Sequence, residues 1–162
     1  MNVIDESGLL AISTRLQRLS EQIRKEGFLV YQTYGIDFEP KWFPVIYTLH
    51  IKPVLSVIEL AAEIGYTHPS TISLLKELEE EKLIRSKKDK QDERKRLLQL
   101  SEKGRKLVER MQPVWAAMVA AIAELTDTRN NLMKGIIEVE GRLREKSFFE
   151  RAQEYKIAPG KR

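Results

Sequence analysis

The chain has 162 residues, a net charge of +4 and no cysteine. This length is sufficient for one domain with a core, and the lack of cysteine excludes disulfides, thiolate metal sites and thiol redox chemistry. No apolar run of about 18 residues is present, and the N-terminal M-N-V-I-D-E-S-G lacks a basic segment followed by an apolar one. We therefore expect no membrane partner, no secretory signal and a cytoplasmic location.

The first third of the chain predicts two helices separated by a linker. Apolar residues recur at close to 3.6-residue spacing over residues 7–26, which predicts a helix that ends at Gly27. Residues 28–40 are aromatic and irregular. A short helix is expected over residues 42–50, because a proline at position 53 disfavours helix immediately before it.

The clearest local signal is the capping box Ser56-Val57-Ile58-Glu59. In such a box the Ser hydroxyl accepts from the Glu amide and the Glu carboxylate accepts from the Ser amide. It predicts a helix over 56–64, which Gly65 can end in the left-handed conformation. A hydrophobic staple is expected between two leucines that flank the box, Leu55 and Leu60.

A second helix is expected directly after this one. Thr67 can cap it, Pro69 suits its first turn, and the helix is predicted to run to about residue 81. Three of its apolar residues are expected to face inward, namely Ile72, Leu75 and Leu78. Two helices joined by about three residues that include a glycine form a helix-turn-helix.

Residues 82–106 hold eleven Lys or Arg and four Asp or Glu, so this segment carries +7 while the rest of the chain sums to −3. Apolar pairs lie at both ends of residues 83–100 and polar residues lie between them, which predicts a two-stranded ribbon with a charged tip. The strands are expected at 83–88 and 96–100, and the tip at 89–95. A basic ribbon directly after a helix-turn-helix indicates a nucleic-acid-binding wing.

The remainder of the chain predicts helices again. Ser101 is expected to cap a long helix that ends near Leu125, with a kink or bend at Pro113. Thr126 and Asp127 are candidate caps for a last helix. Its apolar stripe is predicted to consist of Leu132, Ile136, Val139 and Leu143. The final residues, 157–162, are interpreted as a frayed tail.

These motifs resemble the MarR-type winged-helix transcriptional regulators. Residues 89–104, D-K-Q-D-E-R-K-R-L-L-Q-L-S-E-K-G, are similar to the family signature D-x-x-D-x-R-x-x-x-x-x-L-T-x-x-G. Glu59-Leu60-Ala61 resembles the E-L-A of the first motif helix, and residues 78–84 resemble the L-x-x-x-G-L-I that ends the recognition helix. This chain departs from the pattern at Lys82, where the family has glycine, and a side chain there adds strain to a left-handed cap.

The resemblance implies a mainly α fold with a small β-wing, a winged helix-turn-helix with N- and C-terminal dimerisation helices. We expect a dimerisation segment and linker at 1–38, the winged lobe at 39–105 and dimerisation helices at 106–156, all in one structural domain. The family implies a homodimer that places a recognition helix, here 67–81, in each major groove of double-stranded DNA and a wing in each adjacent minor groove. We expect a repressor, and the family implies release by a small, often aromatic, effector.

The DNA-contacting residues are predicted in two groups. Side chains near the N-terminus of a recognition helix reach base edges, and those are Thr67, His68, Ser70, Thr71, Ser73 and Lys76. An alternative for Thr67 and Ser70 is that they only cap the helix. In the wing, Asp92 is expected to orient Arg94 toward the minor groove. Phosphate-neutralising residues are expected at Lys87, Lys88, Lys90, Lys95 and Arg96, although a strand cannot direct all of them to one face.

Other functional classes have less support. Trp42 and Tyr47 are candidates for lining an effector pocket, and ordinary core packing explains them equally well. Two histidines without cysteine do not indicate a metal site, and no cofactor is expected. Nucleotide-binding and hydrolase motifs are absent, so we do not expect an enzyme. The alternative to a DNA-binding regulator is a winged-helix module that uses the same basic surface for an acidic protein partner.

Overall fold

The computed structural model describes residues 2–88 and 95–155. Its contacts divide the chain into two compact units, residues 1–118 and 119–162, and helix α6 (Glu102–Thr126) continues from the first into the second. The first unit holds the helix-turn-helix and the sheet, and the second holds the C-terminal helices.

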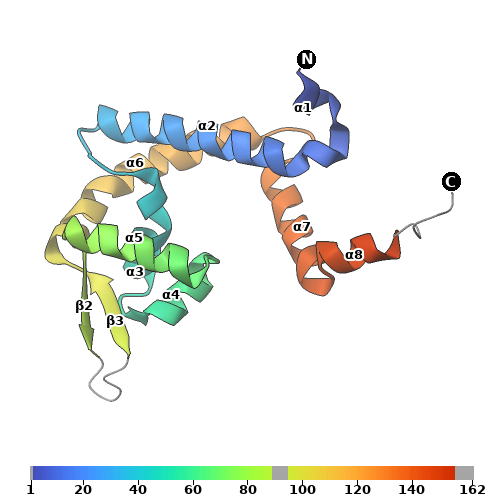
Figure 1. Cartoon of the computed structure of the whole chain (residues 1–162). Coiled ribbons are helices and arrows are strands. Elements are labelled where there is room, and N and C mark those ends of the chain that lie inside the picture. The colour runs from blue at the N-terminus through green and yellow to red at the C-terminus, as the bar shows by residue number, and fades with distance from the viewer. Residues whose placement is uncertain (1, 89–94, 156–162) are drawn as a thin grey trace. The chain divides into compact units, whose positions relative to one another are not determined.

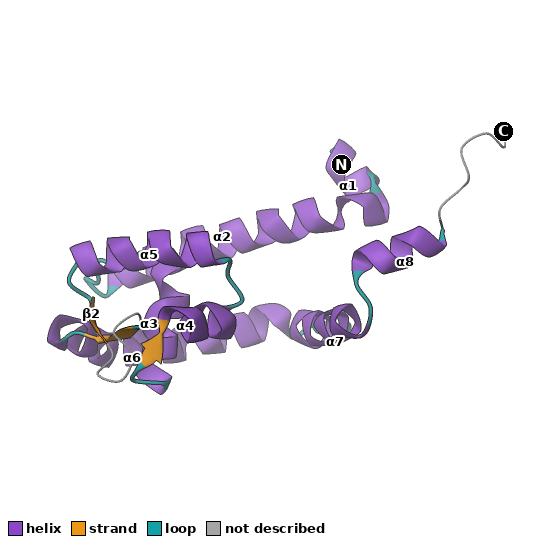
Figure 2. Ribbon diagram, turned by 60° about the horizontal axis from the view of Figure 1, so that its bottom comes forward, coloured by secondary structure: helices purple, strands orange, loops and turns teal. Residues whose placement is uncertain are grey.

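Most of the chain is helical. In the first unit the helical elements are α1 (Val3–Glu6), η1 (Gly8–Ala11), α2 (Ile12–Thr33), η2 (Pro40–Trp42), α3 (Phe43–Ile51), α4 (Val57–Ile64) and α5 (His68–Glu80). The strands are β1 (Leu55–Ser56), β2 (Ile84–Lys88) and β3 (Arg96–Leu100), and the second unit contains the end of α6, α7 (Leu132–Glu145) and α8 (Phe148–Glu154) (Figure 1). Figure 2 shows how little of the chain is strand, which confirms the predicted mainly α fold with a small sheet.

Local sequence signals form the helix-turn-helix as predicted. Ser56 caps α4, its hydroxyl accepting from the Glu59 amide at 3.3 Å while the Glu59 carboxylate accepts from the Ser56 amide at 2.7 Å. These hydrogen bonds with Ser56 lower the pKa of the Glu59 carboxyl, because they favour its ionised form. Gly65 ends α4 with a φ of 69° and Thr67 caps α5, so three residues join the two helices, as predicted.

The sheet is antiparallel with the order β1-β3-β2. The wing strands pair from Ile84↔Leu100 to Lys88↔Arg96, within one residue of the predicted bounds. The short β1, which the sequence did not indicate, pairs Leu55 with Leu98 on the other side of β3. The central strand therefore ties the wing to the start of α4.

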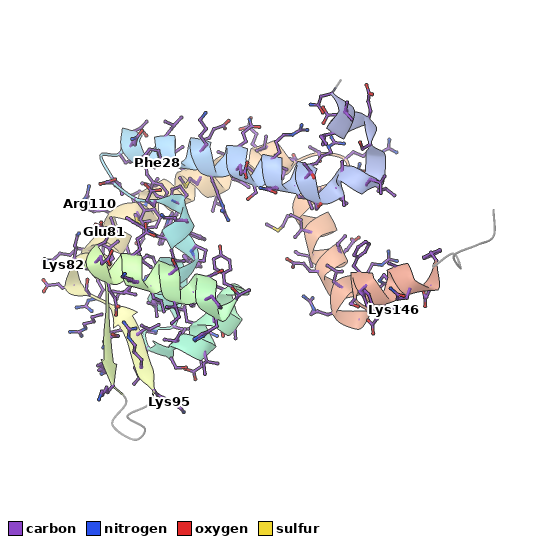
Figure 3. The ribbon with its side chains drawn as sticks, in the orientation of Figure 1. Phe28, Glu81, Lys82, Lys95, Arg110 and Lys146 are labelled. Carbon is purple, nitrogen blue, oxygen red and sulfur yellow. The ribbon has the colours of Figure 1, made fainter. Side chains whose placement is uncertain are left out.

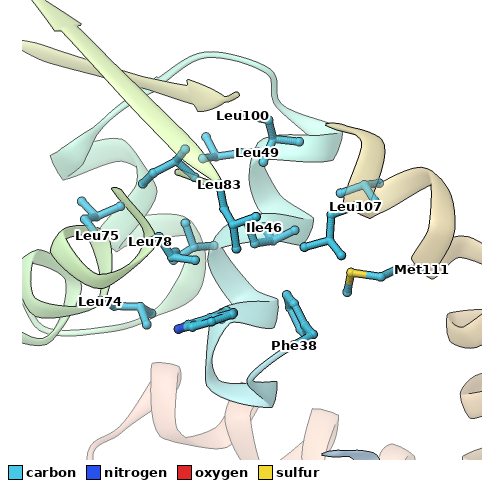
Figure 4. Close-up of a cluster of buried hydrophobic side chains, with 14 of the residues drawn as sticks. Phe38, Ile46, Leu49, Leu74, Leu75, Leu78, Leu83, Leu100, Leu107 and Met111 are labelled. Carbon is cyan, nitrogen blue, oxygen red and sulfur yellow. The ribbon is translucent and has the colours of Figure 1, made fainter. Parts of the chain in front are cut away.

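One core joins these elements. Leucines of α5 and β3, together with Leu83 directly before β2, meet α3 and the first turns of α6 in a continuous buried cluster (Figure 4). Figure 4 shows side chains from all of these elements, among them Ile46, Leu49, Leu75, Leu78, Leu83, Leu100, Leu107 and Met111. The orientation of α5 and of the base of the wing is thus fixed by packing between elements far apart in the sequence.

The end of α5 shows how the chain accommodates Lys82. Lys82 has a φ of 57°, the left-handed conformation that its place in the family pattern predicts. The Lys82 amide donates to the Glu79 carbonyl and the Leu83 amide donates to the Leu78 carbonyl, both at 2.9 Å, which forms a Schellman motif. Tertiary contacts reinforce it, because the Ser101 hydroxyl donates to the Lys82 carbonyl at 2.6 Å.

Ser101 caps α6 as predicted, since its hydroxyl accepts from the Gly104 amide at 2.9 Å. Gly104 is required here for a separate reason. A Cβ at this position would lie 2.1 Å from the Leu83 carbonyl oxygen, much closer than any real contact. The last residue of the family signature therefore lets α6 pack directly on the backbone between α5 and β2.

Several predicted element bounds were wrong. Gly27 does not end the first long helix, which continues to Thr33 and is followed by Gly35 with a φ of 63°. The helix continues because Tyr31 packs into the core, and such tertiary burial outweighs the small cost of an internal glycine. Ile72 was expected to face inward but is 40% exposed, and the buried stripe of α5 consists of Thr71, Leu74, Leu75 and Leu78.

The C-terminal bounds also differ from the prediction. Pro113 lies inside α6, and the kink or bend expected there stays a prediction. Neither Thr126 nor Asp127 caps the next helix, because the Thr126 hydroxyl donates back to Ile122 and Asn131 caps α7 instead. A separate helix, α8, follows, and its capping box at Ser147 and Glu150 is the sequence signal that could have identified it.

Candidate nucleic-acid interface

Helix α5 has one buried and one polar, exposed face. Its buried stripe faces the core, and the opposite face carries exposed residues, namely His68, Ser70, Ile72, Ser73 and Lys76. Packing on one side thus holds a helix whose other side offers hydroxyl, imidazole, ammonium and apolar groups. Hydroxyls bond base edges or phosphates, and an apolar side chain such as that of Ile72 suits a thymine methyl group.

The two threonines of α5 have structural roles. Thr67 caps the helix, and its hydroxyl donates to the Ser70 hydroxyl at 2.9 Å. This agrees with the capping alternative while leaving Thr67 and Ser70 exposed. Thr71 is fully buried and its hydroxyl donates to the Thr67 carbonyl at 3.0 Å, so it is not accessible to DNA and we exclude it from the candidate surface.

The wing has two chemically different faces. Lys87 shares its face with Arg85, whose guanidinium donates to Gln99 at 3.3 Å, and this face points away from the buried side chains. The other face carries buried Ile84 and Leu98 and ends in the exposed pair Lys88 and Arg96. The predicted basic residues are therefore divided between the faces, and Arg85 is an exposed cation that the sequence-based set did not include.

Residues 89–94, most of the predicted tip of the wing, lie outside the described residues. Lys90, Asp92 and Arg94 fall within 89–94, so their predicted roles stay predictions. Lys95, the last residue of the predicted tip, is exposed and lies at the end of the wing remote from Glu81 and Lys82 (Figure 3). Its positive charge contributes to lowering the pKa of Glu59 on α4, after the hydrogen bonds from Ser56.

Arg96 is engaged within the protein. Its guanidinium forms an ion pair with Glu79 of α5, and its Nε donates to the Ser86 hydroxyl at 2.8 Å. A guanidinium held by two protein acceptors is less available to a phosphate than the ammonium of Lys87, which has no such acceptor within residues 2–88 and 95–155.

The two candidate effector residues lie in different surroundings. Trp42 is buried against Phe38, and its indole N–H has no hydrogen-bond partner among the described residues. Tyr47 is exposed and stacks on Phe43, with their ring centroids 5.1 Å apart. The structure does not bring these two candidates together.

Tyr47 instead belongs to an aromatic group on α3 and α6. The ring of Trp115 meets those of Phe43 and Tyr47 edge-on, at 5.8 and 5.4 Å, and His50 lies beside both Tyr47 and Trp115. The Trp115 indole donates to the Tyr31 hydroxyl at 2.9 Å, and burial raises the pKa of Tyr31. This group offers stacking faces together with an imidazole.

Trp42 lines a separate, open cleft of about 880 Å³ between the α2–α3 loop, the end of α5 and the start of α6. Its lining is strongly charged, and its cations already have partners: Lys41 pairs with Glu77 at 2.6 Å, and Arg110 donates to the Gly35 carbonyl at 3.0 Å. The hydrogen bond between Lys41 and Glu77 raises the pKa of Lys41 and lowers that of Glu77. These contacts connect the elements around the cleft to one another, and they occupy the cations that a ligand would need.

Two further observations limit the kinds of site that the described residues can form. Within residues 2–88 and 95–155, no cluster of three His, Asp or Glu side chains is arranged to hold a metal ion. In the same part of the chain, no helix combines the length and apolar character needed to cross a membrane.

The arrangement of a helix-turn-helix, a two-stranded wing and a following long helix defines a winged helix-turn-helix protein. Residues 35–95 match the family model described as the MarR family. The matched segment includes both motif helices and most of the wing, and the match confirms the resemblance predicted from the sequence. No curated protein matches the sequence significantly.

Solved structures share the fold over most of the chain. The M. tuberculosis transcriptional regulator MOSR in complex with DNA is 17% identical, with a TM-score of 0.70, over 83% of this chain and 96% of that one. The S. aureus MepR–DNA complex is 20% identical, with a TM-score of 0.67, over 83% and 97%. The Streptomyces coelicolor regulator PcaV in complex with its natural ligand is 18% identical, with a TM-score of 0.65, over 91% and 99%.

Proposed function

We propose that this protein is a dimeric, sequence-specific DNA-binding transcriptional regulator. The observation that carries the proposal is the exposed polar face of α5, held rigidly by its buried stripe beside a basic wing. In a major groove His68, Ser70 and Ser73 would face base edges, and Ile72 would contact a thymine methyl group. Lys76, Arg85 and Lys87 would neutralise phosphates, and Arg94 is proposed for the minor groove.

The dimer is proposed from apolar surface that one chain leaves uncovered. Leu9 and Leu10 of η1 are 87% and 92% exposed, and no residue of α7 or α8 is buried. Soluble proteins rarely leave contiguous apolar surface of this kind open unless a partner covers it. A two-fold dimer would place two α5 helices about one DNA turn apart, on two half-sites.

We further propose a repressor that a small aromatic anion releases. The aromatic group of Phe43, Tyr47, Trp115 and His50 supports this part, since it joins stacking rings to an imidazole next to the lobe's core. The PcaV structure, in complex with its natural ligand, is one of a protein of this fold that holds a ligand. A ligand there would have to favour one arrangement of α3 and α6 over another to change DNA affinity.

The test begins with selection of duplex DNA from a random-sequence pool by the wild-type protein. Fluorescence anisotropy then measures the affinity for the selected duplex at several salt concentrations. We expect log affinity to fall steeply with log salt, by roughly 0.9 for each phosphate neutralised. Lys87→Ala should reduce this slope by about 0.9, whereas the control Lys25→Ala, an equal charge change on the exposed surface of α2, should leave it unchanged.

Failure to enrich any sequence would contradict a sequence-specific regulator and favour the alternative, a protein-interaction module. Equal slopes for wild type, Lys87→Ala and Lys25→Ala would remove the wing from the proposed contact surface.

A further inference from the structure

Arg96 differs from the other wing cations in the direction of its side chain. It pairs with Lys88 in the strand register, and it lies on the same face of β3 as the buried Leu98 and Leu100. That face is directed toward α5, whereas Arg85 and Lys87 lie on the opposite face. The position that sequence reasoning assigned to phosphate contact therefore points toward the recognition helix.

The contacts of Arg96 join three elements. The guanidinium pairs with the carboxylate of Glu79 on α5, and its Nε donates to Ser86 on β2 at 2.8 Å. The two charged side chains are 44% and 27% exposed, so the pair is partly shielded by the lobe. An arginine with two fixed acceptors is held more firmly than a single surface ion pair.

The surrounding charge explains why Glu79 is needed. Lys88 lies directly opposite Arg96 in the ladder, and like charges in that position destabilise a strand pair. The Glu79 carboxylate offsets this repulsion at the end of the five-residue ladder, next to the tip. At the other end the Schellman motif and the Ser101 hydrogen bond already attach the wing to α5.

We propose that Arg96 and Glu79 form a strut that fixes the wing relative to the recognition helix, so that Arg96 is a positioning residue and not a phosphate contact. For its effect on DNA this inference rests on the proposed function. Without the strut, the two strands remain paired but their angle to α5 varies. Binding of helix and wing in adjacent grooves must then fix this angle, and the lost conformational freedom weakens the affinity for DNA.

The direction in which Glu79→Ala changes the affinity for DNA separates this strut from a simple effect of net charge. Glu79→Ala removes a negative charge from the proposed recognition helix, so charge alone predicts tighter binding to DNA. The strut predicts weaker binding, because the released wing must be ordered again on the DNA. Glu80→Ala is the matched control, since Glu80 is the next residue of α5 and its ion pair with Lys76, at 3.9 Å, is long and exposed.

The experiment measures anisotropy with the duplex selected by the wild-type protein. We expect Glu79→Ala to weaken binding by roughly three- to tenfold, and Glu80→Ala to leave it unchanged or tighter. The double variant Glu79→Ala/Arg96→Ala should bind about as weakly as Arg96→Ala alone, because both changes remove one strut. Binding by Glu79→Ala that equals or exceeds wild type overturns the inference.

A second measurement needs no DNA. Hydrogen exchange of the β2 and β3 amides should be faster in Glu79→Ala than in Glu80→Ala, while the amides of α3 remain protected equally in both. Equal exchange in the two variants overturns the strut. If the wild-type protein selects no DNA sequence, the proposed function fails while hydrogen exchange still decides the strut.

Discussion

The winged lobe buries most of its large apolar side chains, whereas the terminal helices η1, α7 and α8 leave theirs exposed. In the lobe, side chains such as Leu60, Leu78 and Leu98 are fully buried, and the exposed faces of α5 and the wing are polar or basic. In η1, α7 and α8, large apolar side chains such as Leu10 and Phe148 stand in solvent. The two regions belong to one chain of ordinary composition, so the contrast reflects location and not overall hydrophobicity.

The difference indicates that the lobe has a complete hydrophobic core and that the terminal helices do not. The lobe has buried its core and capped the N-termini of α4, α5 and α6, so its exposed polar groups are available for a polar partner. The terminal helices have not completed a core, which is why we propose that a second copy of the chain covers them. Three substitutions, each paired with a control, would break or sharpen this contrast.

The largest effect is expected inside the lobe, at Gly104. A Cβ at Gly104 would lie 2.1 Å from a backbone oxygen, whereas a Cβ at Gly27 meets only the Met118 Cε at 3.7 Å. Gly104→Ala should therefore cost at least about 3 kcal/mol of unfolding free energy, because backbone of α6 or β2 has to move. Gly27→Ala, also inside a helix, should be neutral or stabilise by up to about 1 kcal/mol. Chemical denaturation measures both, and a tolerated Gly104→Ala would contradict the close packing of α6 on Leu83.

The next effect concerns the terminal helices. Leu9→Ser/Leu10→Ser should weaken self-association by about tenfold or more, since buried apolar anchors dominate interfaces of this kind. The control Ile58→Ser changes a 75% exposed side chain of the lobe and should leave association unchanged. Sedimentation equilibrium would report the two masses, that of one 18.8 kDa chain and that of two. A wild-type protein that stays monomeric would end the dimer proposal.

The smallest effect is expected at Lys82, where the lobe carries local strain. Its φ of 57° is costly for a residue with a Cβ, so Lys82→Gly should stabilise the fold by roughly 0.5–1 kcal/mol after the entropy of the unfolded glycine is counted. Lys82→Ala removes the same charge but keeps the Cβ, and it should give no such gain. Thermal unfolding of the two variants separates strain from charge. Equal stabilities would show that the left-handed turn carries no measurable strain.

Local chemistry made much of the fold predictable. The capping box at Ser56, the left-handed Gly65 and the apolar pairs of the wing each specify their own conformation, and all three were confirmed. Predictions failed where tertiary packing decided the outcome. Gly27 stayed helical because of residues beyond it, and Thr71 took a buried position because the Thr67 carbonyl accepts from its hydroxyl.

The candidate site was predictable as a region but not in the direction of each side chain. The alternation of side chains along β3 predicted that the wing cations would not all lie on one face. Only the structure shows that Arg96 lies on the face next to α5 and pairs with Glu79. A partner on another element leaves no trace in local spacing. The same limit applies to Trp42 and Tyr47, which lie close in sequence but in separate surroundings.

The central claim is that the exposed face of α5 reads a DNA sequence. The most direct measurement is the ratio of affinities of the wild-type protein for its selected duplex and for a shuffled duplex of equal composition, at about physiological salt. We expect the selected duplex to bind roughly a thousandfold tighter or more, as specific regulators do. Ser73→Ala should lower this ratio while leaving the affinity for the shuffled duplex unchanged. A ratio near one in the wild-type protein would contradict the account.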